Sequence, residues 1–378
     1  MNVSRRAKCG GVDPNESLNK SQIYVTTAGF KDSFAYDKLI QLLIWQIVKP
    51  GSAFVFGGSW RIPVLHKLLD RNFVKDLRSD GTFNELAFNR EYESEWSGSI
   101  EDAFFNTDLF DKHRALKQPE YEHSGRSAKD AYYVISVDVG RLGCQSVAIV
   151  NKVTPQLQGV ALKTLVNIYT YDDEHFEVQA TKIKQLYFRY KARTLVVDAN
   201  GLGVGLVDYL IKPTIDEDTM ETLAPFGVMN DEDNHYKKFI VEETILDAMY
   251  LIKATAEINS DAHVNVLTQI SSGKVKFLID ERTAKTKLLG TKIGAAMTPE
   301  ERAGYLKPFT LTSILKEEMM NLREKREGKH ISLDAANKKI KKDKFSAFEY
   351  GLYYIKLVED DEKKRRKRRK LSDFMFFS

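Results

Sequence analysis

The chain has 378 residues, of which 43% are hydrophobic and 29% are charged, so it carries enough apolar side chains for a full core. That length allows two domains, or one large domain with an appendage. No apolar run reaches the roughly 18 residues of a membrane span, and no apolar segment typical of a secretory signal follows the N-terminus, so we expect an intracellular protein without a membrane partner. Two cysteines and the absence of an HExxH motif argue against thiol and zinc chemistry.

The first part of the chain has a short α/β-like pattern. Residues 21–27 and 53–56 read as strands, and residues 34–48 and 62–77 have the apolar spacing of helices. One or two such units are too short to close a core. We therefore expect this part to pack on something else.

A linker region follows. Residues 88–98 are polar with spaced aromatic side chains, and residues 121–130 have the composition of a linker. The predicted division is an incomplete first domain over 1–84, a linker subdomain over 85–130, a second domain over 131–360 and a basic tail over 361–378.

The second domain begins with three successive strand patterns, which indicate an antiparallel meander, and continues with alternating helices and strands. The pattern predicts strands over 132–137, 147–153, 161–171 and 194–197, helices over 176–190 and 202–211, and a further strand that ends near 227–229. This order is that of a ribonuclease H-like mixed sheet, with parallel strands added to the meander and helices on both faces. The predicted class is therefore α/β, preceded by an incomplete α/β segment of the P-loop ATPase type.

Two acidic residues end apolar strands of this domain. Asp138 follows the first strand and Asp198 follows the fourth. In a ribonuclease H-like sheet these strands are neighbours, so both carboxylates are expected at one edge. A carboxylate in such a place is costly to desolvate unless a cation holds it. The two acids therefore predict a shared metal site.

A third candidate, Asp343, precedes a helical pattern in which Phe345, Phe348 and Leu352 share one face. An acid in the first turn of this helix would lie beside whatever that face packs on. The alternative is a simple helix cap, because Asp is favoured there. Glu349 is a fallback ligand, although an exposed position is expected for it.

The ligand types narrow the choice of metal. Carboxylates without nearby His or Cys favour Mg²⁺ or Mn²⁺ over zinc. Two such ions about 3.5 to 4 Å apart activate water and stabilise the leaving oxygen in phosphodiester hydrolysis. The three acids therefore predict two-metal nuclease chemistry.

Gly201, Gly203 and Gly205 allow a rival interpretation as a dinucleotide-binding turn. A Rossmann fingerprint needs its acid on the following strand, whereas here the acid precedes the glycines and a meander comes first. An actin-like or sugar-kinase ATPase would need a second phosphate loop, which is not found. The glycines are better explained by a tight turn beside Asp198.

Eight consecutive cations lie near the C-terminus and carry +8, while the formal net charge is +4, so the rest of the chain sums to −4. Such a run is expected to stay unfolded until a polyanion such as double-stranded DNA neutralises it, although a solubilising end or a localisation-type patch is an alternative. The predicted DNA-binding residues are Lys363, Lys364, Arg365, Arg366, Lys367, Arg368, Arg369 and Lys370.

Three strings, VISVDVGRLG, TLVVDANGLGVGLVDYL and KDKFSAFEYGLYYI, occur in this order. Over about residues 85 to 358 the chain resembles the nuclease domain of the large subunit of the tailed-bacteriophage DNA-packaging terminase. The resemblance implies a Mg²⁺- or Mn²⁺-dependent endonuclease that cuts concatemeric DNA in the bacterial cytoplasm, with the portal protein and the small terminase subunit as partners. The matching catalytic and metal-binding positions are Asp138, Asp198 and Asp343. Many members have a second acid where this chain has Lys344.

The front of the chain departs from that family. The string IYVTTAG resembles the coupling motif of the terminase ATPase, with Thr26 and Thr27 sensing the nucleotide, but the Walker A and Walker B motifs are missing. The resemblance implies ATP as a cofactor only if a separate ATPase half supplies them. A truncated prophage gene, an internal-start product and a split protein are all compatible with this pattern.

Two other functions stay open. The chain is alternatively a non-catalytic or truncated packaging component that binds DNA, portal or small subunit without cutting. Another ribonuclease H-like enzyme, such as a transposase or a junction resolvase, would share the acids but not the leading segment.

Overall fold

A computed structural model describes residues 2–4, 20–29, 34–70, 72–79, 85–96, 103–125, 130–140, 145–156, 160–172, 174–216, 219–232, 234–240, 245–327, 330–338 and 340–375. The chain forms two compact units, one of Met1–Ser79 with Phe83–Glu101 and one of Asp80–Thr82 with Asp102–Ser378. No helix within the described ranges is both long enough and apolar enough to cross a membrane.

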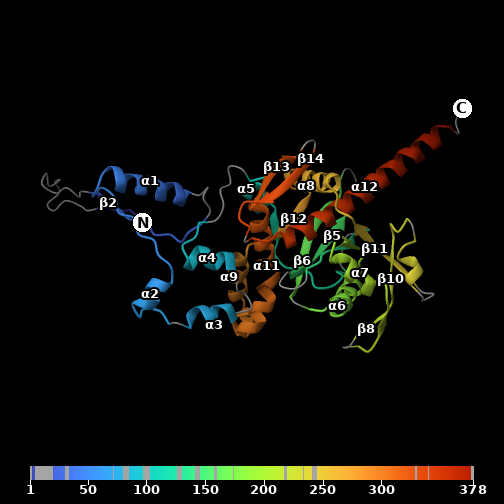
Figure 1. Cartoon of the computed structure of the whole chain (residues 1–378), viewed down its shortest axis with the longest axis horizontal. Coiled ribbons are helices and arrows are strands. Elements are labelled where there is room, and N and C mark those ends of the chain that lie inside the picture. Colours follow the sequence, from blue (N-terminus) through green and yellow to red (C-terminus); the bar gives the residue numbers. More distant parts are fainter. Residues whose placement is uncertain are drawn as a thin grey trace. The chain divides into compact units, whose positions relative to one another are not determined.

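The smaller unit consists of helices and one pair of short strands (Figure 1). Strands β1 and β2 pair antiparallel. The bounds are Asn2–Ser4 for β1, Lys20–Gln22 for β2, Phe34–Val48 for α1, Arg61–Leu65 for α2, Phe73–Ser79 for α3 and Glu85–Tyr92 for α4.

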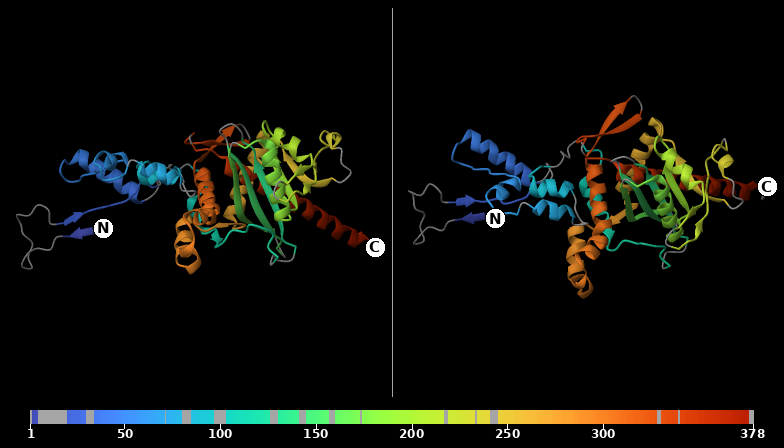
Figure 2. Two further views of the ribbon diagram at one scale, coloured as in Figure 1. Left: turned by 90° about the horizontal axis from the view of Figure 1, so that it is seen from below. Right: turned by 60° about the horizontal axis from the view of Figure 1, so that its bottom comes forward.

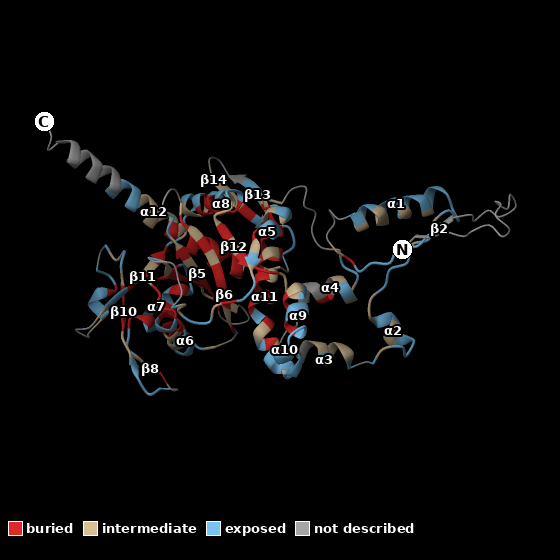
Figure 3. Ribbon diagram, turned by 180° about the vertical axis from the view of Figure 1, so that it is seen from behind, coloured by how far each residue is buried: buried red, intermediate tan, exposed pale blue. Residues whose placement is uncertain are grey.

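The strands expected over 21–27 and 53–56 are largely wrong. Only Lys20–Gln22 is a strand, and residues 23–29 and 53–59 pair with no strand in the described part of this unit. A strand needs a neighbour for its backbone hydrogen bonds, which an apolar pattern alone does not supply. Val25, Phe54 and Phe56 are exposed, helix α1 has no buried residue, and Figure 3 shows α1 largely without buried colour.

The larger unit is built on an eight-stranded mixed sheet of order β10-β11-β7-β4-β5-β6-β12-β3. Strands β4, β5 and β6 form the antiparallel meander, β7 joins β4 in parallel, and β11 and β10 follow in parallel. Figure 2 shows the twist of this sheet. The bounds are Arg114–Leu116 for β3, Tyr132–Asp138 for β4, Gln145–Thr154 for β5, Leu162–Asp172 for β6, Thr194–Asp198 for β7, Phe226–Val228 for β10, Leu246–Ile252 for β11 and Val275–Leu278 for β12. The predicted ribonuclease H-like order is confirmed.

Helices cover both faces of the sheet, as predicted. One core packs Ile183 and Leu206 of α6 and α7 against one face, and the other packs Val266, Leu315 and Phe348 of α8, α11 and α12 against the opposite face. The bounds are Thr107–Lys112 for α5, Phe176–Arg189 for α6, Gly203–Leu210 for α7, Ala256–Ser271 for α8, Glu281–Leu289 for α9, Lys292–Ala296 for α10, Pro299–Met320 for α11 and Asp343–Met375 for α12. Small pairs are β8 (Thr214–Ile215) with β9 (Thr222–Leu223) and β13 (Leu322–Glu327) with β14 (His330–Ala335), and a 3-10 turn η2 spans Lys237–Phe239.

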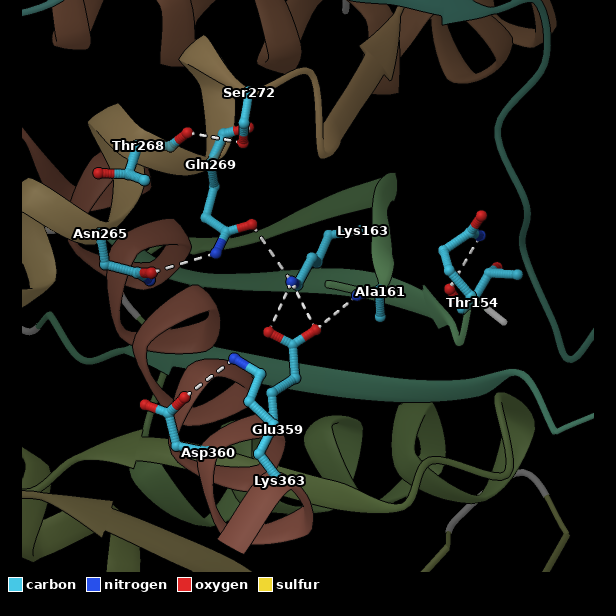
Figure 4. Close-up of polar contacts among 11 residues, drawn as sticks. Thr154, Ala161, Lys163, Asn265, Thr268, Gln269, Ser272, Glu359, Asp360 and Lys363 are labelled. Carbon is cyan, nitrogen blue, oxygen red and sulfur yellow. Dashed lines mark hydrogen bonds and ion pairs between the residues drawn. The ribbon is translucent and has the colours of Figure 1, made fainter. Parts of the chain in front are cut away.

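A buried ion pair fastens the middle of α12 to the edge of the meander. Lys163 of β6 is 1% exposed, and its Nζ donates to both carboxylate oxygens of Glu359 at 2.8 and 3.0 Å (Figure 4). The Glu359 carboxylate also accepts from the backbone N–H of Ala161 at 2.8 Å, and Gln269 of α8 accepts from Lys163. These contacts fix the course of α12 and so the position of its first turn.

The expectation of an unfolded basic tail is wrong, because α12 continues through the eight cations to Met375 (Figure 2). Lys and Arg are good helix formers, and acidic residues lie one turn before them. Lys363 pairs with Asp360 at 3.2 Å and Arg365 with Asp361 at 3.0 Å. The side chains of residues 366–370 lie outside the described ones.

Candidate active site

The two strand-end acids lie side by side. Asp138 is the last residue of β4 and Asp198 the last of β7. The two strands are parallel, with Val137 opposite Val197, so both acids lie at the same carboxyl edge of the sheet. On the far side of β7, Ile252 pairs with Asp198. This is the arrangement expected from the sequence.

The glycines after Asp198 build the turn into α7. Gly201 has a φ of +54°, in the left-handed region that favours glycine. A Cβ on Gly203 would lie 1.7 Å from the backbone oxygen of Asp198. The backbone N–H of Asn200 donates to Oδ1 of Asp198 at 3.0 Å. The glycines therefore let the chain fold tightly onto Asp198, as the sequence indicated, and they hold one orientation of its carboxylate.

Asp343 is the first residue of α12. The orphan backbone N–H of Phe345 in that turn donates at 2.9 Å to Oε2 of Glu318, a residue of α11. A carboxylate of a different helix therefore satisfies this turn. Asp343 itself is half-buried, and its pKa is raised because burial outweighs the attraction of Lys344 and its neighbours.

The acids act on one another through their charges. Burial raises the pKa of Asp138 to about 8, and the charges of Asp343, Asp198 and Glu318 contribute in the same direction. The pKa of Asp198 is also raised by burial, which outweighs the hydrogen bond from Asn200. The structure thus places Asp198 and Asp343 within electrostatic range of Asp138. Clustered carboxylates that resist ionisation are characteristic of sites that receive a cation.

Sequence analysis missed Glu318, which is 3% exposed and whose pKa burial raises to about 7. It lies in the long helix α11, about 25 residues before Asp343, and no spacing rule links the two. The only available signal was an acid next to the apolar pair Met319 and Met320, both of which are buried.

The expectation of an exposed Glu349 is also wrong. This residue is 2% exposed on α12, and its Oε2 lies 2.6 Å from Nδ1 of His263 of α8, which is buried as well. Burial raises the pKa of Glu349, against the effect of His263. Because its carboxylate is engaged by His263, Glu349 braces α12 against α8.

The donor set fits a hard divalent ion in part. Across the described ranges, no three Asp, Glu, His or Cys side chains lie close enough to share one ion. Asp138 and Asp198 nevertheless supply carboxylates from neighbouring strand ends, and Mg²⁺ is commonly bound through one or two protein carboxylates together with several waters. The arrangement therefore fits an ion held by two carboxylates, with Asp343 close by, and does not preform a three-ligand cage.

The other predicted binding residues lie apart from these acids in the chain. Thr26 and Thr27 belong to the smaller unit, where the Thr26 hydroxyl donates to the Thr27 carbonyl at 2.9 Å. Thr26 also lines a cavity of about 490 Å³ in that unit, together with Lys38 and Trp96. Of the predicted DNA-binding cations, Lys363 and Arg365 are solvent-exposed on α12.

No protein-family model and no curated protein matches the sequence. Similar solved structures are those of phage large terminases. The large terminase nuclease of thermophilic phage G20c with bound magnesium is 15% identical, with a TM-score of 0.38 over 67% of this chain and 98% of that one. The large terminase nuclease domain of Thermus phage P74-26 is 12% identical, with a TM-score of 0.32 over 62% and 90%. The large terminase of bacteriophage HK97 is 8% identical, with a TM-score of 0.37 over 83% and 60%.

Proposed function

We propose that the chain is a divalent-metal-dependent DNA endonuclease of the phage terminase large-subunit type, which cuts concatemeric viral DNA during packaging. One observation carries the proposal. Asp138 and Asp198 end neighbouring parallel strands of a ribonuclease H-like sheet, and Asp343 lies within electrostatic range of Asp138. The sequence resemblance over residues 85 to 358 adds the packaging context.

In this proposal Asp138 and Asp198 hold the cation and Asp343 completes the site. When bound, Mg²⁺ or Mn²⁺ polarises the phosphodiester and lowers the pKa of the attacking water. The protein contributes position. The Asn200 N–H orients the Asp198 carboxylate, and the packed helix α12 keeps Asp343 beside the strand ends. Burial of Asp138 excludes competing water from its carboxylate.

The remaining assignments follow from the sequence. Residues 1–84, with Thr26 and Thr27, would belong to an ATPase module that needs a separate half for ATP hydrolysis, followed by the linker 85–130 and the nuclease domain 131–360. The cations of residues 363–370 would hold DNA phosphates, and portal and small terminase subunit would be the protein partners. Double-stranded DNA is the substrate.

Incubation with supercoiled plasmid in Mn²⁺, Mg²⁺ or EDTA tests the proposal. Nicking or linearisation that requires metal is expected for the wild-type chain and for Asp208→Asn, a matched change on the exposed face of α7. Asp198→Asn is expected to lose cleavage while staying folded. Metal-independent cutting, or undiminished cutting by a folded Asp198→Asn, would contradict the assignment.

A non-catalytic packaging component is the second candidate, favoured by the lack of a preformed three-ligand group within the described ranges. The two candidates differ in metal binding. An intact site gains thermal stability from Mn²⁺, because the ion binds the folded state. A chain that folds normally but shows no rise in Tm up to millimolar Mn²⁺ would favour the non-catalytic component over the nuclease.

A further inference from the structure

A buried ion pair lies directly beside Asp343. The Nζ of Lys344 is 3.3 Å from Oε1 of Glu318, and the two side chains are only 8% and 4% exposed. Lys344 also donates to Oε1 of Gln145 at 3.1 Å, and Gln145 in turn donates to Asp172 at 2.6 Å. The ammonium is therefore held in place from two sides.

The pair belongs electrostatically to the acidic site. Glu318 acts on Asp138 in the same direction as Asp198 and Asp343 do, and Asp343 acts on Glu318. Lys344 acts on Asp343 and on Glu318, and Lys342 acts on Asp138, Asp198 and Asp343. The site is thus made of four carboxylates and two ammonium groups.

The charge of this set is the decisive quantity. With all six groups ionised, four carboxylates and two ammonium groups leave −2, which one divalent cation balances. A second divalent ion would leave a surplus of +2 in a largely desolvated place, where uncompensated charge is costly. Without the ammonium of Lys344, the same carboxylates would leave −3 and would attract a second ion more strongly.

We propose that Lys344 neutralises Glu318 as a built-in cation and so restricts this site to one divalent ion in the absence of DNA. This inference rests on the proposed metal-dependent function and adds its stoichiometry. Glu318 and Lys344 then have a positioning role. Glu318 fixes the first turn of α12 through the Phe345 N–H, and Lys344 occupies the charge position that a second ion would take.

Counting bound Mn²⁺ tests the inference on the full chain without DNA, by calorimetric titration and by the electron paramagnetic resonance signal of free Mn²⁺. We expect one ion per wild-type chain. Lys344→Met should raise the number to two, because the Glu318 charge becomes free. Lys338→Met removes one charge from an exposed lysine and should leave it at one.

The double variant Glu318→Gln/Lys344→Met guards against loss of folding, since it removes both charges and leaves neither buried alone. It is expected to bind one ion. Two ions in the wild type, or one in a folded Lys344→Met, would overturn the inference while leaving metal-dependent cleavage intact. No bound Mn²⁺ in the wild type would overturn both this inference and the proposed function. If Lys344→Met fails to fold, the wild-type count and the double variant decide.

Discussion

At the scale of single residues, protonation of Asp138 sets a pH dependence. Burial and neighbouring acids raise its pKa from 3.8 to about 8 in the folded chain. Between these values the folded state binds a proton that the unfolded state has lost, so the free energy of unfolding falls as pH rises. The slope for one such group is at most about 1.4 kcal/mol per pH unit. Above pH 8 both states are ionised and the slope from this group ends.

Urea unfolding in EDTA at a series of pH values between about 4 and 8 measures this effect. Asp138→Asn, which cannot ionise, should flatten the pH dependence, while Asp208→Asn should keep it. Glu318 contributes in the same direction because burial raises its pKa to about 7. A wild-type stability that rises over this range, or a slope unchanged in Asp138→Asn, would contradict the account.

At the scale of secondary-structure elements, the close packing of α12 on the meander can be tested at Gly351. A Cβ there would lie 2.5 Å from Oγ of the fully buried Ser136 and 3.1 Å from Nδ2 of Asn151. Gly351→Ala should therefore destabilise the protein, by about 1–3 kcal/mol as for other overpacked cores.

Gly304 of α11 is the matched control, because a methyl group added there would have nothing within 4 Å. Gly304→Ala should stabilise the protein by up to about 1 kcal/mol through helix propensity. Thermal and urea unfolding of both variants give the comparison. Equal effects of the two substitutions would show that α12 does not approach β4 so closely.

The ion pair between Lys163 and Glu359 can be tested in the same way. Glu359→Ala leaves the Lys163 ammonium buried without its carboxylate, and loss of one partner of a buried pair typically costs about 3–5 kcal/mol. Glu174→Ala breaks the more exposed pair with Lys182 and should cost no more than about 1 kcal/mol. Urea unfolding distinguishes them, and a loss for Glu359→Ala no larger than that for Glu174→Ala would remove α12 anchoring from the account.

Secondary-structure patterns predicted the larger unit well, because its strands β4 to β7 carry their own apolar signals. The same patterns identified Asp138 and Asp198, since a carboxylate ending an apolar strand is visible in one dimension. Glu318, Lys344 and the contact of His263 with Glu349 join different elements, so no local pattern indicated them. The predicted strand over 53–56 failed because a strand depends on neighbours that its own sequence does not specify.

At the scale of the whole molecule, the cations of α12 predict salt-dependent DNA binding. Replacing all eight Lys and Arg residues of 363–370 by Gln keeps the length and should weaken binding to a DNA duplex. The plot of log K against log salt should become less steep by up to about 0.9 for each phosphate that is no longer neutralised. Fluorescence anisotropy at several salt concentrations measures both effects, and an unchanged slope would show that these cations do not bind phosphate.

The central claim is that Asp138 and Asp198 together bind a divalent cation. Anomalous scattering from crystals grown with Mn²⁺ tests it most directly. We predict a strong anomalous peak at about 2.0–2.3 Å from a carboxylate oxygen of each acid, as expected for hard cations, with Asp343 beside it. A well-ordered crystal with no peak between these two carboxylates, or with its only peaks elsewhere, would contradict the claim.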